Sequence, residues 1–166
     1  MDVAKTNLFH KNNQGDEDRI TDGFLRVLLR SDIELFNTIF NRLGIDTSAC
    51  TDPELVIGNT RKQWWHRSDN SDRISLNGEP DMILDIPNGP LLLIEVKWGD
   101  QLDADQINRY YSVVKELNNA HLIVITKREG DRERVSNISE EITYISWQEV
   151  CQIIRLYCSQ PDTERF

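Results

Sequence analysis

Three short apolar runs give the clearest structural signal in the chain. Residues 81–86 and 91–98 are separated by the turn-forming sequence Pro87-Asn88-Gly89-Pro90, and a third run covers 121–126. Runs of this length between turn signals are typical of buried β-strands, and a Pro/Asn/Gly-rich connection favours a hairpin. The pattern therefore predicts three core strands, the first two of which form a hairpin.

Apolar residues at helical spacing predict helices on both sides of these strands. One helix is expected to follow Asp16, and a second to run from an N-cap at Ser31 to Leu43, where Gly44 stops it. Asp103 is expected to cap a helix that runs to about Leu117 and ends at Asn118-Asn119. A final helix is expected from Ser146 or Trp147 to about Tyr157.

The remaining segments carry weaker signals. Residues 55–67 contain β-favouring side chains, and 68–78 read as a polar loop with a possible short strand at 73–76. A charged loop is expected over 127–137 and a short strand over 142–145. The resulting order, α-α-β-β-β-α-β-β-α, predicts an α/β protein with a central mixed β-sheet flanked by helices.

Length and composition favour one compact domain. The 166 residues are 39% hydrophobic and 28% charged, which is ordinary for a globular protein and sufficient for one core. We expect a flexible arm over 1–15, a single domain over 16–158 and a loose tail over 159–166. No apolar run is long enough for a membrane span, and the N-terminal residues lack the apolar core of a secretory signal.

Cysteine usage and net charge indicate the cellular compartment and limit the kinds of nucleic-acid binding to expect. Cys50, Cys151 and Cys158 have no metal-ligand spacing, which favours reduced thiols in a cytoplasmic protein. The net charge of −9 argues against indiscriminate coating of nucleic acid. It leaves a nuclease possible, because a metal site concentrates carboxylates and a bound divalent cation reverses the local field.

The strand at 91–98 carries two charges where apolar residues are expected. Period-2 alternation places Glu95 and Lys97 on the same face as Leu91 and Leu93. Burying a carboxylate and an ammonium is costly unless they pair or ligate something. Such a break in an apolar pattern indicates a functional or strained site more often than an error.

Hairpin geometry brings Asp81 level with these charges. A loop over 87–90 would place Asp81 opposite Val96, whereas one loop residue more or fewer would place it opposite Glu95 or Lys97. Because facing follows register, joint function of Asp81 and Glu95 requires the shifted pairing or a β-bulge.

This group suits hydrolysis of a phosphodiester. The carboxylates of Asp81 and Glu95 and the backbone carbonyl of Val96 are oxygen ligands of the kind Mg²⁺ or Mn²⁺ prefers. The cation would polarise the phosphoryl group, and Lys97 could hold or activate the attacking water.

Pro80-Asp81 followed by Glu95-Val96-Lys97 resembles the PD-(D/E)XK nuclease superfamily, which has the restriction-endonuclease-like fold. The resemblance implies that Asp81 and Glu95 bind metal and that Lys97 is the catalytic lysine. Gln106 and Tyr110 are similar to the Q-x-x-x-Y element of one branch, where it supports the active site. Glu17 resembles the leading acidic residue, often a further metal ligand.

The resemblance implies DNA as substrate, with RNA as an alternative, and a possible homodimer, because family members often cut both strands as dimers. Restriction, phage defence and DNA repair are compatible roles. Basic and aromatic side chains that could contact phosphates and bases are Arg61, Lys62, Trp65, Arg67 and Arg109.

Simpler explanations exist for each residue. Glu95 and Lys97 could be a solvent-facing ion pair, Asp81 could merely begin its strand, and Gln106 and Tyr110 could only pack against the sheet. Glu17 could complement a helix dipole, and the aromatic residues could be core. At the level of the whole protein, the rivals are a non-catalytic module of the same fold that binds proteins, and a metal-dependent hydrolase of free nucleotides.

Overall fold

The computed structural model describes residues 33–50, 64–66, 73–75 and 80–160. The expected N-terminal arm, the helix after Asp16, the Ser31 cap and most of the C-terminal tail lie outside these residues. The described helices are α2 (Ile33–Arg42), α4 (Ala104–Val114), α5 (Asp131–Ile138) and α6 (Trp147–Ser159). The described strands are β1 (Trp64–His66), β2 (Arg73–Ser75), β3 (Met82–Asp85), β4 (Leu91–Lys97), β5 (Ala120–Thr126) and β6 (Thr143–Ser146).

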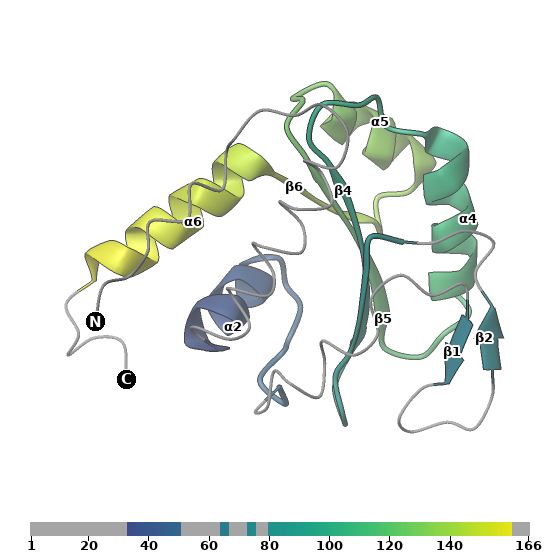
Figure 1. Cartoon of the computed structure of the whole chain (residues 1–166), viewed down its shortest axis with the longest axis horizontal. Helices are drawn as coiled ribbons and strands as arrows, with labels where there is room; N and C mark the ends of the chain where they lie inside the picture. Colours follow the sequence, from purple (N-terminus) through teal and green to yellow (C-terminus); the bar gives the residue numbers. More distant parts are fainter. Residues whose placement is uncertain (1–32, 51–63, 67–72, 76–79, 161–166) are drawn as a thin grey trace, which may run out of the picture.

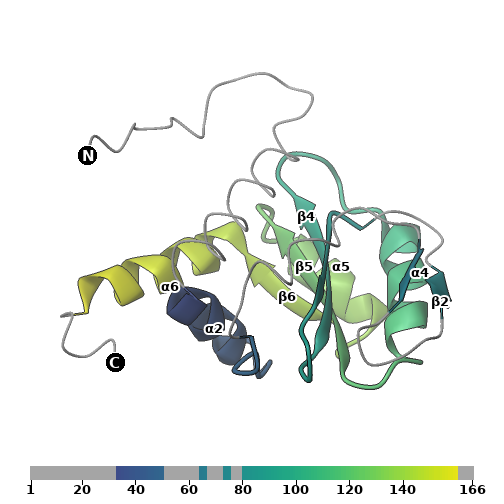
Figure 2. The same ribbon diagram turned by 60° about the horizontal axis from the view of Figure 1, so that its bottom comes forward.

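The central sheet is mixed, as the pattern predicts. Its strand order is β3-β4-β5-β6, in which β3 is antiparallel to β4 whereas β4, β5 and β6 are mutually parallel. The short strands β1 and β2 pair with each other and form a separate antiparallel ribbon. Both views place this ribbon on the α4 side of the sheet (Figures 1 and 2).

Helices cover both faces of the sheet. Figure 1 shows α2 and α6 on one side and α4 on the other. The apolar residues divide accordingly: Leu92, Ile94 and Val96 of β4 join the core under α2 and α6. Leu91 and Leu93 join the core under α4. The alternation predicted along β4 is therefore confirmed, and it assigns Glu95 and Lys97 to the α4 face.

Local signals explain where the helices begin and end. The Asp103 carboxylate accepts hydrogen bonds from the backbone N–H groups of Asp105 and Gln106, at 2.9 and 3.3 Å, and so caps α4 as expected. Gly44 follows α2 with φ of 76°, a left-handed conformation that favours glycine. Ser146 and Glu149 form a reciprocal capping box at the start of α6.

One prediction for this part of the chain is wrong. The charged segment 127–137 was expected to be a loop, but α5 occupies Asp131–Ile138. Its apolar content is low, and Val135 is its buried apolar residue. The helix packs against α4 and β6, so tertiary contacts supply what periodicity does not show. None of the helices in the described part of the chain combines the length and apolarity needed to span a bilayer.

Candidate active site

The carboxyl end of β4 carries a buried ion pair. The Lys97 ammonium lies 2.8 Å from the Glu95 carboxylate, and the two side chains are 15% and 1% exposed. The interpretation as a solvent-facing pair is therefore wrong, because both groups have lost most of their water. Removing charges from water costs several kcal/mol each, so the sheet must gain compensation from this pair or from a ligand.

The hairpin register places Asp81 beside this pair. Asp85 pairs with Leu91 and Met82 pairs with Ile94, so continuing the register by one residue sets Asp81 opposite Glu95. The connection thus spans residues 86–90 rather than 87–90, which is the shifted pairing that joint function requires. The Asp81 carboxylate also accepts a hydrogen bond of 2.8 Å from the backbone N–H of Val96.

The pKa of Glu95 reflects its burial and the two charged groups beside it. Burial first, and then the negative charge of Asp81, raise the pKa of the Glu95 carboxyl from 4.5 to about 7, against the opposing effect of Lys97. The second carboxylate oxygen, Oε2, is buried and has no hydrogen-bond partner among the described residues. Two carboxylates and one ammonium therefore lie together at this end of β4.

Gln106 and Tyr110 come from α4 toward the same group. The Gln106 side-chain amide donates a 3.0 Å hydrogen bond to the Tyr110 hydroxyl. Tyr110 is fully buried, and burial is the main cause that raises the pKa of its hydroxyl. The charges of Glu95 and Asp81 also raise that pKa, so the hydroxyl senses both carboxylates. The structure thus brings together Asp81, Glu95, Lys97, Gln106 and Tyr110.

A divalent cation fits the donor set. The Glu95 oxygen without a partner among the described residues and the adjacent Asp81 carboxylate are hard oxygen donors, and they lie close enough for the charge of Asp81 to raise the pKa of Glu95. In the part of the chain that the structure describes, no group of three or more His, Cys, Asp or Glu side chains gathers as a metal site. Mg²⁺ commonly binds through one or two carboxylates and keeps several waters, so two acids suffice for it.

Of the other predicted residues, Arg109 and Trp65 belong to described elements, and the charge of Arg109 lowers the pKa of the Tyr110 hydroxyl. Arg109 is exposed on α4, between the two supporting residues in sequence. Trp65 belongs to β1, where it pairs with Ile74. The remaining predicted residues, Glu17, Arg61, Lys62 and Arg67, lie outside the described residues.

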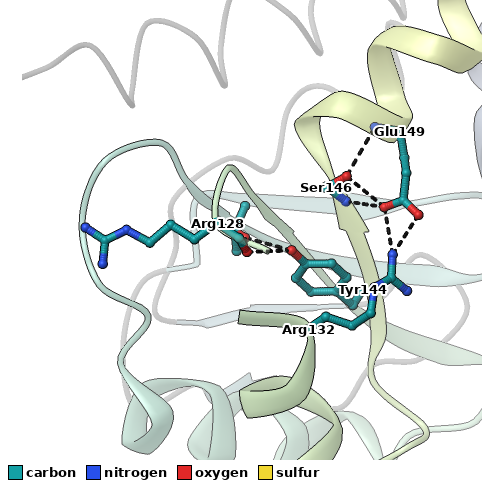
Figure 3. Close-up of polar contacts among 6 residues, drawn as sticks. Arg128, Arg132, Tyr144, Ser146 and Glu149 are labelled. Atoms are coloured by element: carbon teal, nitrogen blue, oxygen red, sulfur yellow. Dashed lines mark hydrogen bonds and ion pairs between the residues drawn. The ribbon is translucent and has the colours of Figure 1, made fainter. Parts of the chain in front are cut away.

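A second polar cluster at the ends of β5 and β6 was not predicted. Thr126 pairs with Lys97 across the parallel strands, so it lies on the same face of the sheet. Its hydroxyl is 3.0 Å from that of Tyr144 and 3.3 Å from the Arg128 carbonyl. The Tyr144 hydroxyl also lies 3.0 Å from the Arg128 carbonyl (Figure 3). A polar residue ending an apolar parallel strand could have indicated Thr126, because such ends meet at one edge of the sheet. No comparable signal marks Tyr144.

Arg132 connects this cluster to α6. Its guanidinium lies 4.7 Å from the centre of the Tyr144 ring and makes two hydrogen bonds, of 2.6 and 2.8 Å, to Glu149 (Figure 3). Tyr144, Arg132 and Glu149 also line a cavity of about 420 Å³ between β6, α2 and α6. None of the five residues of the carboxylate–lysine group lines that cavity, so the two features are distinct.

Comparison with known proteins assigns no function, so a functional assignment rests on the geometry of the site. No protein-family model matches the chain, and neither curated proteins nor solved structures yield a match.

Proposed function

We propose that the chain is a metal-dependent nuclease that hydrolyses phosphodiester bonds of DNA, with a domain of the restriction-endonuclease-like type. The observation that carries the proposal is the shifted hairpin register. It sets Asp81 opposite a buried Glu95 whose second oxygen lacks a partner, next to Lys97. Glu95 is thus a buried acid whose pKa is raised by desolvation and by a second acid beside it, which is typical of a functional site.

Asp81 and Glu95 would hold the cation, Mg²⁺ or Mn²⁺, with the Val96 carbonyl as a further oxygen donor. When bound, such a cation polarises the phosphoryl group and makes a coordinated water more acidic. The protein contributes the fixed positions of the two acids, because the N–H of Val96 holds Asp81 and Lys97 holds Glu95.

Lys97 is placed to orient the attacking water and to offset negative charge that develops on the phosphate. Its ammonium lies 2.8 Å from Glu95, at the end of β4 where Asp81 and Glu95 meet. Hydrolysis joins the water oxygen to phosphorus and breaks the P–O bond to one sugar oxygen. The attacking water gives up a proton to solvent, and the leaving sugar oxygen takes up a proton from solvent and departs as a hydroxyl. The buried Tyr110 and its hydrogen-bond partner Gln106, both on α4, support the two acids.

Plasmid cleavage tests the proposal. Purified protein with Mg²⁺ or Mn²⁺ should nick or linearise supercoiled DNA, and chelation by EDTA should stop the reaction. Lys97→Ala should reduce the rate at least about a hundredfold, the size expected for loss of a group that stabilises the transition state. Lys115→Ala removes an exposed lysine near the end of α4 and serves as the matched control.

The outcomes separate this proposal from its rivals. Equal activity of Lys97→Ala and the parent protein would exclude the site as the source of cleavage. If the parent protein shows a cooperative thermal melt and yet cleaves neither DNA nor RNA, the result would favour a non-catalytic module. Faster hydrolysis of free nucleotides than of DNA would favour a nucleotide hydrolase.

A further inference from the structure

The loop between β5 and α5 lies beside the carboxylate–lysine group. Thr126, the last residue of β5, pairs with Lys97, the last residue of β4. Arg128 follows Thr126 by two residues, a chain distance of only about 7 Å at the rise of an extended strand. Consequently, whatever is bound at the end of β4 comes close to the start of this loop.

The backbone of this loop is held in place. The Tyr144 hydroxyl lies 3.0 Å from the Arg128 carbonyl and the Thr126 hydroxyl lies 3.3 Å from it. Thr126 is fully buried, so its contact with the Arg128 carbonyl is partly shielded from water. Arg128 therefore starts from a fixed backbone position even though its side chain is exposed.

The side chain of Arg128 bridges two loops. Figure 3 shows it extending away from Tyr144, and its Nη2 donates a 2.8 Å hydrogen bond to the carbonyl of Gly99, which follows β4. A guanidinium has five N–H donors in a rigid fork, and one such bond leaves most of them available. An exposed, oriented guanidinium is well suited to bind a phosphate.

Lys127 adds a second cation at the same edge. Its ammonium lies 5.0 Å from the centre of the Trp98 ring, which orients an otherwise flexible side chain. Trp98 itself packs edge-on against Trp147, with ring centres 5.7 Å apart. The neighbouring Glu129 is exposed and carries the opposite charge, so the loop is not uniformly basic.

We propose that the β5–α5 loop binds backbone phosphates of the DNA strand adjacent to the bond that is cut, through Arg128 with Lys127 beside it. This inference rests on the proposed nuclease function and names part of its substrate-binding surface. The contacts made by these residues would be to phosphate and would not read base sequence. Such contacts would let an acidic protein retain its substrate.

DNA binding measured as a function of salt tests the inference. Fluorescence anisotropy would follow a short labelled duplex binding to the full chain in Ca²⁺, between about 50 and 200 mM salt. Arg128→Ala should weaken binding and lower the magnitude of the log K against log salt slope by about 1, and Arg128→Lys should restore that slope. Lys127→Ala should act in the same direction.

Two controls distinguish phosphate contact from damage to the loop. Glu129→Gln should tighten binding, whereas general disruption of the loop would weaken it. Arg155→Ala, an exposed arginine on α6, should leave affinity and slope unchanged. Thermal melts of all variants establish that they are folded.

The results also separate this inference from the proposed function. Parent-like affinity and slope in Arg128→Ala and Lys127→Ala, in a protein that cleaves DNA, would overturn the inference and leave the nuclease proposal standing. A lowered slope in a protein that binds but never cleaves DNA would support phosphate binding by this loop, but it would overturn the nuclease proposal and with it the placement beside a bond that is cut. Failure of the parent protein to bind DNA at all would overturn both.

Discussion

Glu95 bears most of the electrostatic cost of the site. Its carboxyl is buried, lies near a second carboxylate, and has a pKa raised to about 7. Lys97 neutralises one oxygen and leaves Oε2 without a partner among the described residues. A buried acid with a raised pKa binds either a proton or a cation in preference to remaining bare.

This predicts an unusual dependence of stability on pH in the metal-free protein. The folded-state pKa lies above the unfolded value of 4.5, so the folded state binds the proton more tightly. The contribution of Glu95 is therefore most favourable below about pH 4.5 and is lost as the pH rises through 7. The loss amounts to roughly 3 kcal/mol, at about 1.4 kcal/mol per pKa unit.

Denaturant unfolding in EDTA from pH 4.5 to 8 measures the effect. The difference in unfolding free energy between the parent protein and Glu95→Gln isolates this group from all others that titrate. That difference should shift in favour of Glu95→Gln as the pH rises, and Mg²⁺ should remove much of the shift. Glu116→Gln, at an exposed glutamate, should show no such trend. A pH-independent difference for Glu95→Gln would contradict the assignment.

Among the structural elements, the β3–β4 hairpin sets which residues meet. Its turn closes with a 2.9 Å hydrogen bond from the N–H of Gly89 to the carbonyl of Ile86, and Asn88 has a positive φ of 58°. A Cβ added at Gly89 would lie 2.6 Å from Cγ2 of Ile86. Because a register change moves side chains to the other face, this turn controls the position of Asp81.

Gly89→Ala should therefore destabilise the protein by about 1–3 kcal/mol, the usual cost of overpacking a buried position. Cleavage should fall at a temperature where the variant is still folded, because the turn shifts Asp81 relative to Glu95. Gly130→Ala is the control for the stability measurement alone, since a Cβ there meets nothing within 4 Å but the residue belongs to the β5–α5 loop. Chemical denaturation and plasmid cleavage on the same preparations measure both effects. A neutral Gly89→Ala in both assays would show that the turn does not hold the register.

Sequence reasoning succeeded where local chemistry determines the outcome. The apolar runs, the Asp103 cap and the Gly44 stop correspond to β3, β4, β5 and the ends of α2 and α4. It left the register of the β3–β4 hairpin open, because a connection over residues 86–90 and one over residues 87–90 are equally compatible with the turn signal. It missed α5, whose charged surface and single buried apolar residue, Val135, show no helical period.

At the scale of the whole molecule, the lack of a local sequence signal also explains why only part of the candidate site could be predicted. Glu95 and Lys97 were predictable because they interrupt an apolar strand. The cluster of Thr126, Tyr144 and Arg128 depends on the neighbourhood of β5 and β6, which only the parallel pairing shows. Contacts between elements distant in sequence have no local signature.

Net charge makes a prediction for the whole molecule. The chain carries −9, and its candidate site contains two acids for one lysine, so DNA should be repelled in the absence of a divalent cation. Affinity for DNA should rise at least about tenfold when Ca²⁺ replaces EDTA at constant ionic strength, because the cation reverses the local charge. Asp81→Asn should lower this cation dependence. Equal affinity in EDTA and Ca²⁺ would mean that DNA binds away from the acids.

The most direct test of the central claim is a crystal structure of the protein soaked in Mn²⁺, with anomalous scattering used to locate the ion. We expect one anomalous peak about 2.1 Å from carboxylate oxygens of both Asp81 and Glu95, with Lys97 adjacent, and its loss in Glu95→Gln. Carboxylates that remain without an ion at saturating Mn²⁺, or an ion bound only elsewhere, would contradict the account.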